Sequence, residues 1–194
     1  MREVYAAIER LLANNDPHTP PLIGIDGRCG SGKSTLAAEL ARKYDGAVFH
    51  LDDFYMPFEK RAPDWRERPC ANMELDRFEK EVLCPAKAGK TVAYRPFVCF
   101  EDRFAPTEML TPKKIWIAEG SYAFHPSLAP YYDLKIWLTC SPETQSDRLQ
   151  KREGDNYASF VSTWIPLEEA YAALWNVPES ADLIICTDTA EERI

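Results

Sequence analysis

The stretch "GRCGSGKST" (27–35) decides the fold of this chain. It fills every fixed position of the G-x-x-x-x-G-K-[ST] pattern, whose glycines let the backbone turn and point its N–H groups at a phosphate. The apolar run "PLIGID" (21–26) comes before it, and "STLAAELARKY" (34–44) is expected to form a helix after it. The start of that helix adds partial positive charge where the phosphate binds. This context favours a phosphate-binding loop over a chance glycine turn.

The residues of this loop predict which groups contact the nucleotide. Lys33 reaches the outer phosphates, the Ser34 hydroxyl binds Mg²⁺, and Thr35 is a candidate contact for the α-phosphate. The predicted nucleotide-binding residues are Gly27, Gly30, Ser31, Gly32, Lys33, Ser34 and Thr35. The expected cofactors are therefore ATP and Mg²⁺.

Apolar runs alternate with helical patterns along the rest of the chain. Strands are expected at 21–26, 47–51, 113–120, 133–140 and 181–187, and helices at 73–89 and 141–153. Such alternation predicts an α/β fold of three layers, a mostly parallel sheet with helices on both faces, as in P-loop NTPases. Ligands of such sheets gather at the carboxyl ends of the strands. Asn72 is expected to cap the helix at 73–89, after an irregular proline-rich loop at 56–72.

Length and composition narrow the possible partners. The 194 residues are expected to form one domain, with a small lid at roughly 148–158 and an acceptor-binding insertion at roughly 52–104. A net charge of −8 argues against a nucleic-acid partner, and no apolar run is long enough to span a membrane. The segment 1–16 is expected to be an amphipathic helix rather than a signal peptide. The six cysteines contain no C-x-x-C pair, which argues against a zinc cluster and favours free thiols in the cytoplasm. A homo-oligomer remains possible.

Glu119 is the second predicted functional acid. It ends the run "KKIWIAEG" (113–120), where a Walker-B-type carboxylate would lie near the metal, and Gly120 permits close backbone approach. A solvated glutamate at a strand end is the alternative. A GTPase would need a base-reading N/T-K-x-D motif, which "TPKK" (111–114) does not supply. The motifs leave a small-molecule kinase and a nucleotide-dependent switch open.

Two adjacent aspartates follow the second strand, in "VFHLDDFYMP" (48–57). Side chains of adjacent extended residues point to opposite sides, so only one aspartate is expected to face the phosphates.

Four motifs occur in a characteristic order along the chain. They are "IGIDGRCGSGKST" (23–35), "LDDFY" (51–55), "AEG" (118–120) and the arginine-bearing helix "DRLQKRE" (147–153). Over roughly residues 20–155 the chain resembles the uridine kinase group of P-loop nucleoside kinases, which is related to phosphoribulokinase and bacterial pantothenate kinase. The resemblance implies that Asp52 is the catalytic base close to Mg²⁺ and that Glu119 lies near the metal. With Ser34 they form the predicted metal site, and Asp53 becomes a turn or capping residue.

The resemblance also implies a cationic lid. Arg148 and Arg152 take the places of arginines that grip the phosphates, with Lys151 near them. Arg148 and Arg152 are four residues apart and share a helix face. An ordinary solvated helix surface carries such charges too.

The acceptor pocket of the family lies between the D-x-F-Y segment and the strand that ends in Glu119. Candidate contacts in this region are Asp52, Tyr55, Asp64, Trp65, Arg68, Tyr94, Arg95 and Phe97. Asp64 resembles an acid that holds ribose hydroxyls, the aromatic residues would wall a ring, and the arginines would bind a polar or anionic group. Each aromatic residue is equally open to interpretation as core.

The predicted function is an ATP-dependent kinase that transfers the γ-phosphate to a hydroxyl of a small molecule. The favoured acceptor is a nucleoside such as uridine or cytidine. The segment "KREGDNYASF" (151–160) lacks the longer arginine-rich lid pattern of uridine kinases. The base-reading histidine of that family is not evident either, since His125 falls after the E-G motif. The identity of the acceptor therefore stays open. The alternatives are a kinase of another small alcohol, such as a vitamin or sugar phosphate, and a slow ATP-binding regulatory protein.

Overall fold

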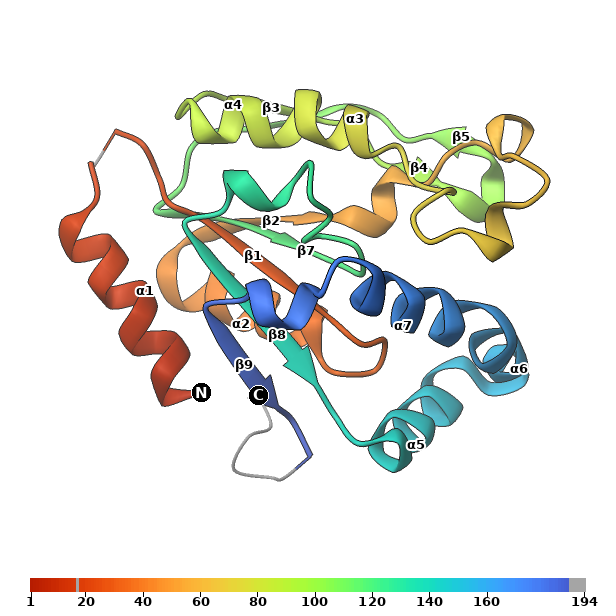
Figure 1. Ribbon diagram of the computed structural model, residues 1–194. Helices are drawn as coiled ribbons and strands as arrows, with labels where there is room; N and C mark the ends of the chain where they lie inside the picture. The colour runs from red at the N-terminus through yellow and green to blue at the C-terminus, as the bar shows by residue number, and fades with distance from the viewer. Residues whose placement is uncertain (17, 189–194) are drawn as a thin grey trace.

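A five-stranded parallel sheet forms the centre of the computed structural model, which describes residues 1–16 and 18–188 (Figure 1). Its strands are β1 (Leu22–Gly27), β2 (Gly46–His50), β7 (Ile115–Glu119), β8 (Leu134–Thr139) and β9 (Leu183–Cys186). They lie in the order β2-β7-β1-β8-β9, and every neighbouring pair is parallel. Each strand overlaps a segment predicted from the sequence, which confirms the α/β fold.

Helices connect and cover these strands. The α-helices are α1 (Arg2–Asn14), α2 (Lys33–Tyr44), α3 (Leu75–Phe78), α4 (Cys84–Lys87), α5 (Pro142–Glu153), α6 (Tyr157–Ser159) and α7 (Ile165–Leu174). The π-helical segment η4 (Glu79–Leu83) joins α3 to α4, and η8 (Phe160–Trp164) joins α6 to α7. Short 3₁₀ turns are η1 (Leu51–Phe54), η2 (Phe58–Lys60), η3 (Trp65–Glu67), η5 (Cys99–Glu101), η6 (Ala129–Tyr131), η7 (Gly154–Asn156) and η9 (Val177–Ser180).

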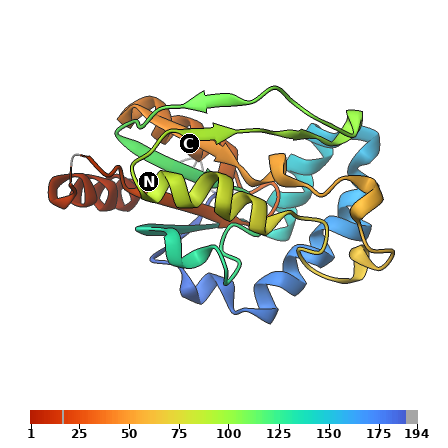
Figure 2. The ribbon, with the colours of Figure 1, turned by 90° about the horizontal axis from the view of Figure 1, so that it is seen from above.

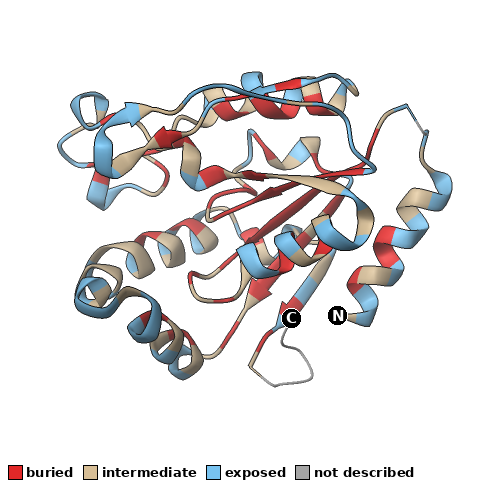
Figure 3. Cartoon of the chain, turned by 180° about the vertical axis from the view of Figure 1, so that it is seen from behind, coloured by how far each residue is buried: buried red, intermediate tan, exposed pale blue. Residues whose placement is uncertain are grey.

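The sheet separates two apolar cores, because successive strand residues face opposite sides. On one face Ile115 and Ile117 of β7 pack in a cluster that includes residues of α1 and α2. On the other face Trp116 and Ala118 pack in a cluster that includes α3, η4, α4 and α7. Figure 3 shows the central strands in the colour of buried residues. Both faces of the sheet are therefore covered, as the continuous apolar strands predict.

Helix α1 has the predicted amphipathic character. Val4 and Ile8 are fully buried, and Leu11 and Leu12 pack partly against the same cluster. None of the helices in the described part of the chain is long and apolar enough to cross a membrane.

Residues 51–110 form a separate layer along one side of the sheet (Figure 2, yellow to green). Two small antiparallel pairs belong to this layer: β3 (Val92–Tyr94) with β6 (Glu108–Leu110), and β4 (Phe97–Val98) with β5 (Arg103–Phe104). The expectation that Asn72 caps the following helix is wrong. The Asn72 carbonyl accepts the Met56 N–H at 2.7 Å, so the backbone is still held outside the helix and Glu74 takes the cap position.

Gly120, directly after β7, is required by the packing at the strand end. Its φ is +145°, and a Cβ there would lie 2.8 Å from the Leu51 Cβ. We expect Gly120→Ala to lower the free energy of unfolding by about 2 kcal/mol or more, because the left-handed backbone and the contact both oppose a side chain. Urea unfolding measures the change. Gly154→Ala is the matched control, since Gly154 has φ +54° but no atom within 4 Å of an added Cβ, and it should lose only about 1 kcal/mol. Equal losses in the two variants would contradict the close approach at Gly120.

Candidate active site

The phosphate-binding loop connects β1 to α2, in the place that the sequence predicts. Gly30 and Gly32 have backbone φ angles of +75° and +96°, which residues with a side chain rarely adopt. A Cβ on Gly27 would lie 2.0 Å from the Leu138 carbonyl oxygen of the neighbouring strand β8. The glycines of the motif are therefore required by backbone conformation and by the packing of the loop on the sheet.

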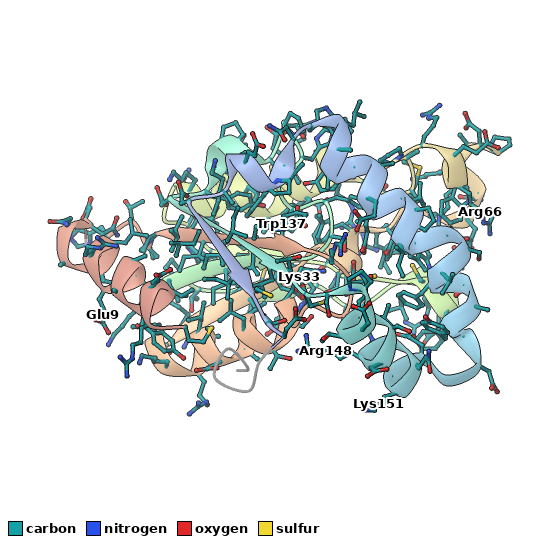
Figure 4. The ribbon with its side chains drawn as sticks, turned by 60° about the horizontal axis from the view of Figure 1, so that its bottom comes forward. Glu9, Lys33, Arg66, Trp137, Arg148 and Lys151 are labelled. Carbon is teal, nitrogen blue, oxygen red and sulfur yellow. The ribbon has the colours of Figure 1, made fainter. Side chains whose placement is uncertain are left out.

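Lys33 opens helix α2 and folds back over the loop. Its Nζ donates to the carbonyl oxygens of Gly27 at 2.8 Å and Arg28 at 3.1 Å. Figure 4 shows Lys33 near the middle of the molecule, close to the ends of the central strands. The ammonium group is thus held at the mouth of the loop by neutral acceptors, which an anionic phosphate can replace.

The carboxyl ends of β7 and β2 bring Glu119 and His50 to the loop. Glu119 is 4% exposed, and its Oε1 accepts from the Ser34 hydroxyl at 3.1 Å. The same oxygen lies 2.5 Å from Nδ1 of His50, and this hydrogen bond raises the pKa of His50 above its usual range. Glu119 and Ser34 therefore meet as predicted, while the contact with His50 was not expected from the sequence.

Asp52 and Asp53 point in different directions. Asp52 lines the same cleft as Lys33, Ser34 and Glu119, whereas the Asp53 carboxylate accepts a hydrogen bond from the Tyr94 hydroxyl. The predicted division of the pair matches the structure, but its physical reason differs. Both residues belong to the 3₁₀ turn η1, in which successive side chains are rotated by about 120°, rather than to an extended strand.

The surroundings of Asp52 make its carboxylate an unusually strong base for an aspartate. Its side chain is open to the cleft, while the protein encloses it on the other sides. Desolvation by the protein atoms around the cleft, together with the neighbouring carboxylates of Glu119 and Glu168, raises the pKa of Asp52 to about 6 in the ligand-free protein, and Lys33 opposes the rise.

Two hollows of about 450 and 460 Å³ lie beside the loop. Both are bordered by Gly30, Gly32, Thr35 and Arg152. The first also reaches Ser31, Thr144, Asp147, Arg148, Lys151 and Thr187. The second, hereafter the acceptor cleft, also contains Cys29, Lys33, Ser34, Asp52, Tyr55, Glu119, Ser121, Tyr122, Glu153, Asn156, Phe160, Trp164 and Glu168. The loop thus lies between two hollows, an arrangement that can hold two different molecules side by side.

Glu168 is a functional candidate that the sequence did not reveal. It lies on α7, and its carboxylate accepts from the Cys29 N–H at 2.8 Å and the Ser121 hydroxyl at 2.5 Å. Segment 161–180 carries no motif, and a glutamate on a helix normally faces solvent. Only the packing of α7 beside the loop brings this acid into the cleft, which also contains Asp52, Glu119 and Glu153.

Arg148, on α5, is hydrogen-bonded to the backbone of the phosphate-binding loop. Its guanidinium donates to the Gly30 carbonyl oxygen at 3.0 Å and to the side chain and carbonyl oxygen of Thr187 at 2.8 and 2.5 Å. The Thr187 hydroxyl in turn donates to the Ser31 carbonyl oxygen at 2.9 Å. Arg148 is therefore a brace between α5, the loop and the end of β9 rather than a free lid residue, and its contact with phosphate stays a prediction.

The predicted lid, at roughly 148–158, falls on the end of α5, on η7 and on the start of α6. Arg152 borders both hollows and forms an ion pair with Glu153, with Nε 2.5 Å from Oε1. Lys151 lines only the first hollow and lies toward the periphery of the molecule in Figure 4. Among Arg148, Lys151 and Arg152, Arg152 is thus the cation that borders both hollows.

Of the aromatic acceptor candidates, Tyr55 lines the acceptor cleft. Its ring centroid lies 6.0 Å from that of Trp164, which in turn lies 5.6 Å from that of Trp65. Trp164 and Phe160, which also line the cleft, come from η8 and had no signal in the sequence.

Three acceptor candidates need correction, because they lie outside the residues that line the cleft. Tyr94 is 5% exposed in the core between Phe49 and Phe54, since it faces inward on β3. Asp64 is exposed and pairs with Arg68 at 3.3 Å, one helical turn away. The exposed Arg95 lies over the Phe104 ring at 4.5 Å. Phe97, the other aromatic candidate of this region, is a core residue packed on Phe104.

The residues present fit a metal that arrives with a nucleotide. The described residues contain no group of three or more His, Cys, Asp or Glu side chains placed to hold a metal ion. Mg²⁺ is usually bound through one or two carboxylates together with substrate phosphates. The Ser34 hydroxyl, Glu119 and Asp52 supply such a partial set in one cleft.

Comparisons with known proteins agree with this geometry. The family model described as an AAA domain matches residues 23–162. A uridine kinase from Clostridium botulinum (strain Kyoto / Type A2) is 31% identical over 148 residues, which is 69% of either chain. The chain belongs to the uridine kinase-like family of P-loop kinases.

Solved structures show the same fold. A possible uridine kinase from Bacillus stearothermophilus superposes with a TM-score of 0.70 at 20% identity, over 94% of this chain and 98% of that one. A D-glycerate 3-kinase from Cryptococcus neoformans gives a TM-score of 0.56 at 14% identity, over 86% and 85%. At these identities the superpositions show the fold, and the family membership confirms the resemblance found in the sequence.

Asp26, directly before the loop in this family member, is a buried acid whose charge affects stability. It is 1% exposed and accepts from the N–H groups of Gly27 and Phe124 and from the Tyr171 hydroxyl. Burial nevertheless raises the pKa of Asp26 from 3.8 to about 6. Between about pH 4 and pH 6 the folded protein therefore holds a proton that the unfolded chain has lost.

The expected result is a loss of stability as the pH rises through this window. The free energy of unfolding of the wild type, minus that of Asp26→Asn, should fall by about 3 kcal/mol between pH 4 and pH 7, since Asn does not titrate. Urea unfolding at several pH values measures this difference. A difference that stays constant with pH would show that the Asp26 pKa is unchanged by folding.

Proposed function

We propose that this protein is a kinase that transfers the γ-phosphate of ATP to a hydroxyl group of a small molecule, with a nucleoside such as uridine or cytidine as the favoured acceptor. The observation that carries the proposal is the position of Asp52, which opens into the same cleft as Lys33, Ser34 and Glu119. A protein that only binds or slowly hydrolyses ATP has no need of an acid placed beside a space for a second substrate.

The residues of the chain divide the work of the transfer. Lys33 leaves the carbonyl oxygens of Gly27 and Arg28 and binds the phosphates of ATP. Asp52 accepts the proton of the acceptor hydroxyl while the hydroxyl oxygen bonds to the γ-phosphorus and the bond to the β-phosphate oxygen breaks, which releases ADP. Mg²⁺, when bound, supplies charge that offsets the negative phosphates, and Ser34, Glu119 and Asp52 are the side chains that would hold it.

Aromatic side chains support a planar acceptor. Tyr55, from the loop after η1, and Trp164, from η8, both line the acceptor cleft with ring centroids 6.0 Å apart, and Phe160 lines the same cleft. Flat aromatic surfaces stack well on a nucleobase. The curated relatives named uridine kinase, and one named uridine-cytidine kinase D from Dictyostelium discoideum, add support for such an acceptor.

An acceptor panel tests the proposal. The protein is incubated with Mg-ATP and, separately, with nucleosides and other small alcohols, and ADP release is followed. We expect uridine or cytidine to raise the rate at least about tenfold over the rate without acceptor. Stimulation by another alcohol alone would identify a different kinase on this scaffold. A slow rate that no acceptor changes would contradict the proposal and favour an ATP-binding regulatory protein.

A further inference from the structure

The inner wall of the acceptor cleft combines aromatic, neutral polar and acidic groups. Besides Glu168, the side chains on this wall belong to Tyr55, Ser121, Tyr122, Asn156, Phe160 and Trp164. The Tyr122 hydroxyl is buried and has no hydrogen-bond partner among the described residues. Its oxygen has almost no exposed surface, so the neutral polar groups that face a ligand are those of Ser121 and Asn156. The wall therefore suits a molecule with a ring and neutral polar groups.

Glu168 carries the fixed charge of this wall. Its two carboxylate oxygens are held by the Cys29 N–H and the Ser121 hydroxyl, which belong to the phosphate-binding loop and to the segment after β7. Its charge contributes to the raised pKa values of Asp52 and Tyr55, so it acts at the base and at the aromatic entrance. A negative charge is thus held rigidly beside the space that the acceptor enters.

Few cations in the described part of the cleft are available to offset this charge. Lys33 is held by loop carbonyl groups and faces the phosphates, and Arg152 is paired with Glu153. Arg28, at the loop, is paired with Glu169, with Nε 2.8 Å from Oε1. Arg68 and Arg95, which the sequence assigned to an anionic acceptor, lie outside the cleft lining.

We propose that Glu168 excludes negatively charged acceptors, so that the substrate of this site is an uncharged alcohol. This inference rests on the proposed kinase activity and specifies the charge of the acceptor. A phosphate or carboxylate on the acceptor would be repelled by the negative charge of Glu168. The free-energy cost of removing its water would also not be offset by an ion pair. The phosphorylated sugars that the sequence left open as acceptors are thereby excluded.

Matched pairs of acceptors that differ mainly in charge provide the test. The pairs are uridine and orotidine, panthenol and pantothenate, glycerol and glycerate, and ribulose and ribulose 5-phosphate. ADP release gives kcat/KM for each compound with the wild-type protein. We expect the uncharged member of the productive pair to be used at least about 100-fold more efficiently than its anionic partner.

Glu168→Gln then assigns the discrimination to one residue. Gln has nearly the same shape, its amide oxygen can accept from the Cys29 N–H, and its amide nitrogen can donate to the Ser121 hydroxyl. We expect the ratio of kcat/KM between the uncharged and anionic members to fall about tenfold, because kcat/KM for the anionic member rises once the like charge at position 168 is removed. The ratio within one variant cancels any effect on the base that both acceptors share. Glu108→Gln, an exposed position on β6, is the matched control and should keep the wild-type ratio.

The outcomes separate this inference from the proposed function. Efficient use of an anionic member by the wild type would uphold the kinase and overturn the exclusion. Discrimination by the wild type that Glu168→Gln leaves unchanged would overturn the role of Glu168. No stimulation of ADP release by any member would overturn the proposed function and this inference with it.

Discussion

Asp52→Asn should bind ATP at least as tightly as the wild type and lose about 100-fold or more of its acceptor-dependent turnover. Asn keeps the shape of the side chain but does not accept a proton, and a positioned base contributes at least about this factor. ATP affinity should not fall, because Ser34 and Glu119 remain to hold Mg²⁺ and the substitution removes a negative charge from a cleft that also contains Glu168. Acceptor-dependent ADP release measures the turnover, and nucleotide titration by calorimetry measures the affinity.

The neighbouring residue provides the control. Asp53→Asn makes the same chemical change one position along, in a side chain that contacts the Tyr94 hydroxyl rather than the cleft. We expect its kcat to stay within about threefold of the wild type, whatever it does to stability. Near-normal turnover of Asp52→Asn, or equal losses in the two variants, would contradict the assignment of Asp52 as the base.

Lys33→Ala should weaken nucleotide binding about tenfold and lower kcat by about 100- to 1,000-fold. The ammonium group is the cation that the loop itself supplies to the phosphates, and a charge placed where negative charge develops contributes this much to rate. The folded structure should persist, since among the described residues the Lys33 side chain donates only to the carbonyl groups of Gly27 and Arg28. ATP titration and initial rates with the productive acceptor measure both effects.

Lys43→Ala is the matched control on the same helix. Lys43 lies in the last turn of α2, where it contacts the Tyr5 ring outside the two hollows beside the loop. Its removal should leave both kinetic constants within about twofold. Unchanged kinetics in Lys33→Ala would show that the loop does not bind the phosphates.

Features carried by continuous segments could be predicted from the sequence. The loop from Gly27 to Thr35 is one such segment, because its glycines set the backbone and its flanks set the strand and the helix. The five strands of the sheet were predicted from apolar runs, and the helix α5 overlaps the segment 141–153 in which a helix was expected. In each case the physical cause lies within a few neighbouring residues.

Features that depend on distant segments could not be predicted. Glu168 enters the cleft only because α7 packs beside the loop, and His50 meets Glu119 only because β2 lies next to β7. Tyr94 was predicted to contact the acceptor, but the pairing of β3 with β6 places its side chain in the core. The type of a single aromatic or charged residue does not distinguish a core or surface position from a substrate-binding position.

The brace formed by Arg148 and Thr187 has a consequence for the order of events during synthesis. Ser31 and Thr187 are 156 positions apart, so a growing chain exposes its phosphate-binding loop long before it contains the residue that holds this loop. At about 5–20 residues per second, the ribosome needs roughly 10 to 30 s to bridge that interval. Until Thr187 has been added, a nascent chain therefore lacks the hydrogen bonds that join the end of β9 to the phosphate-binding loop.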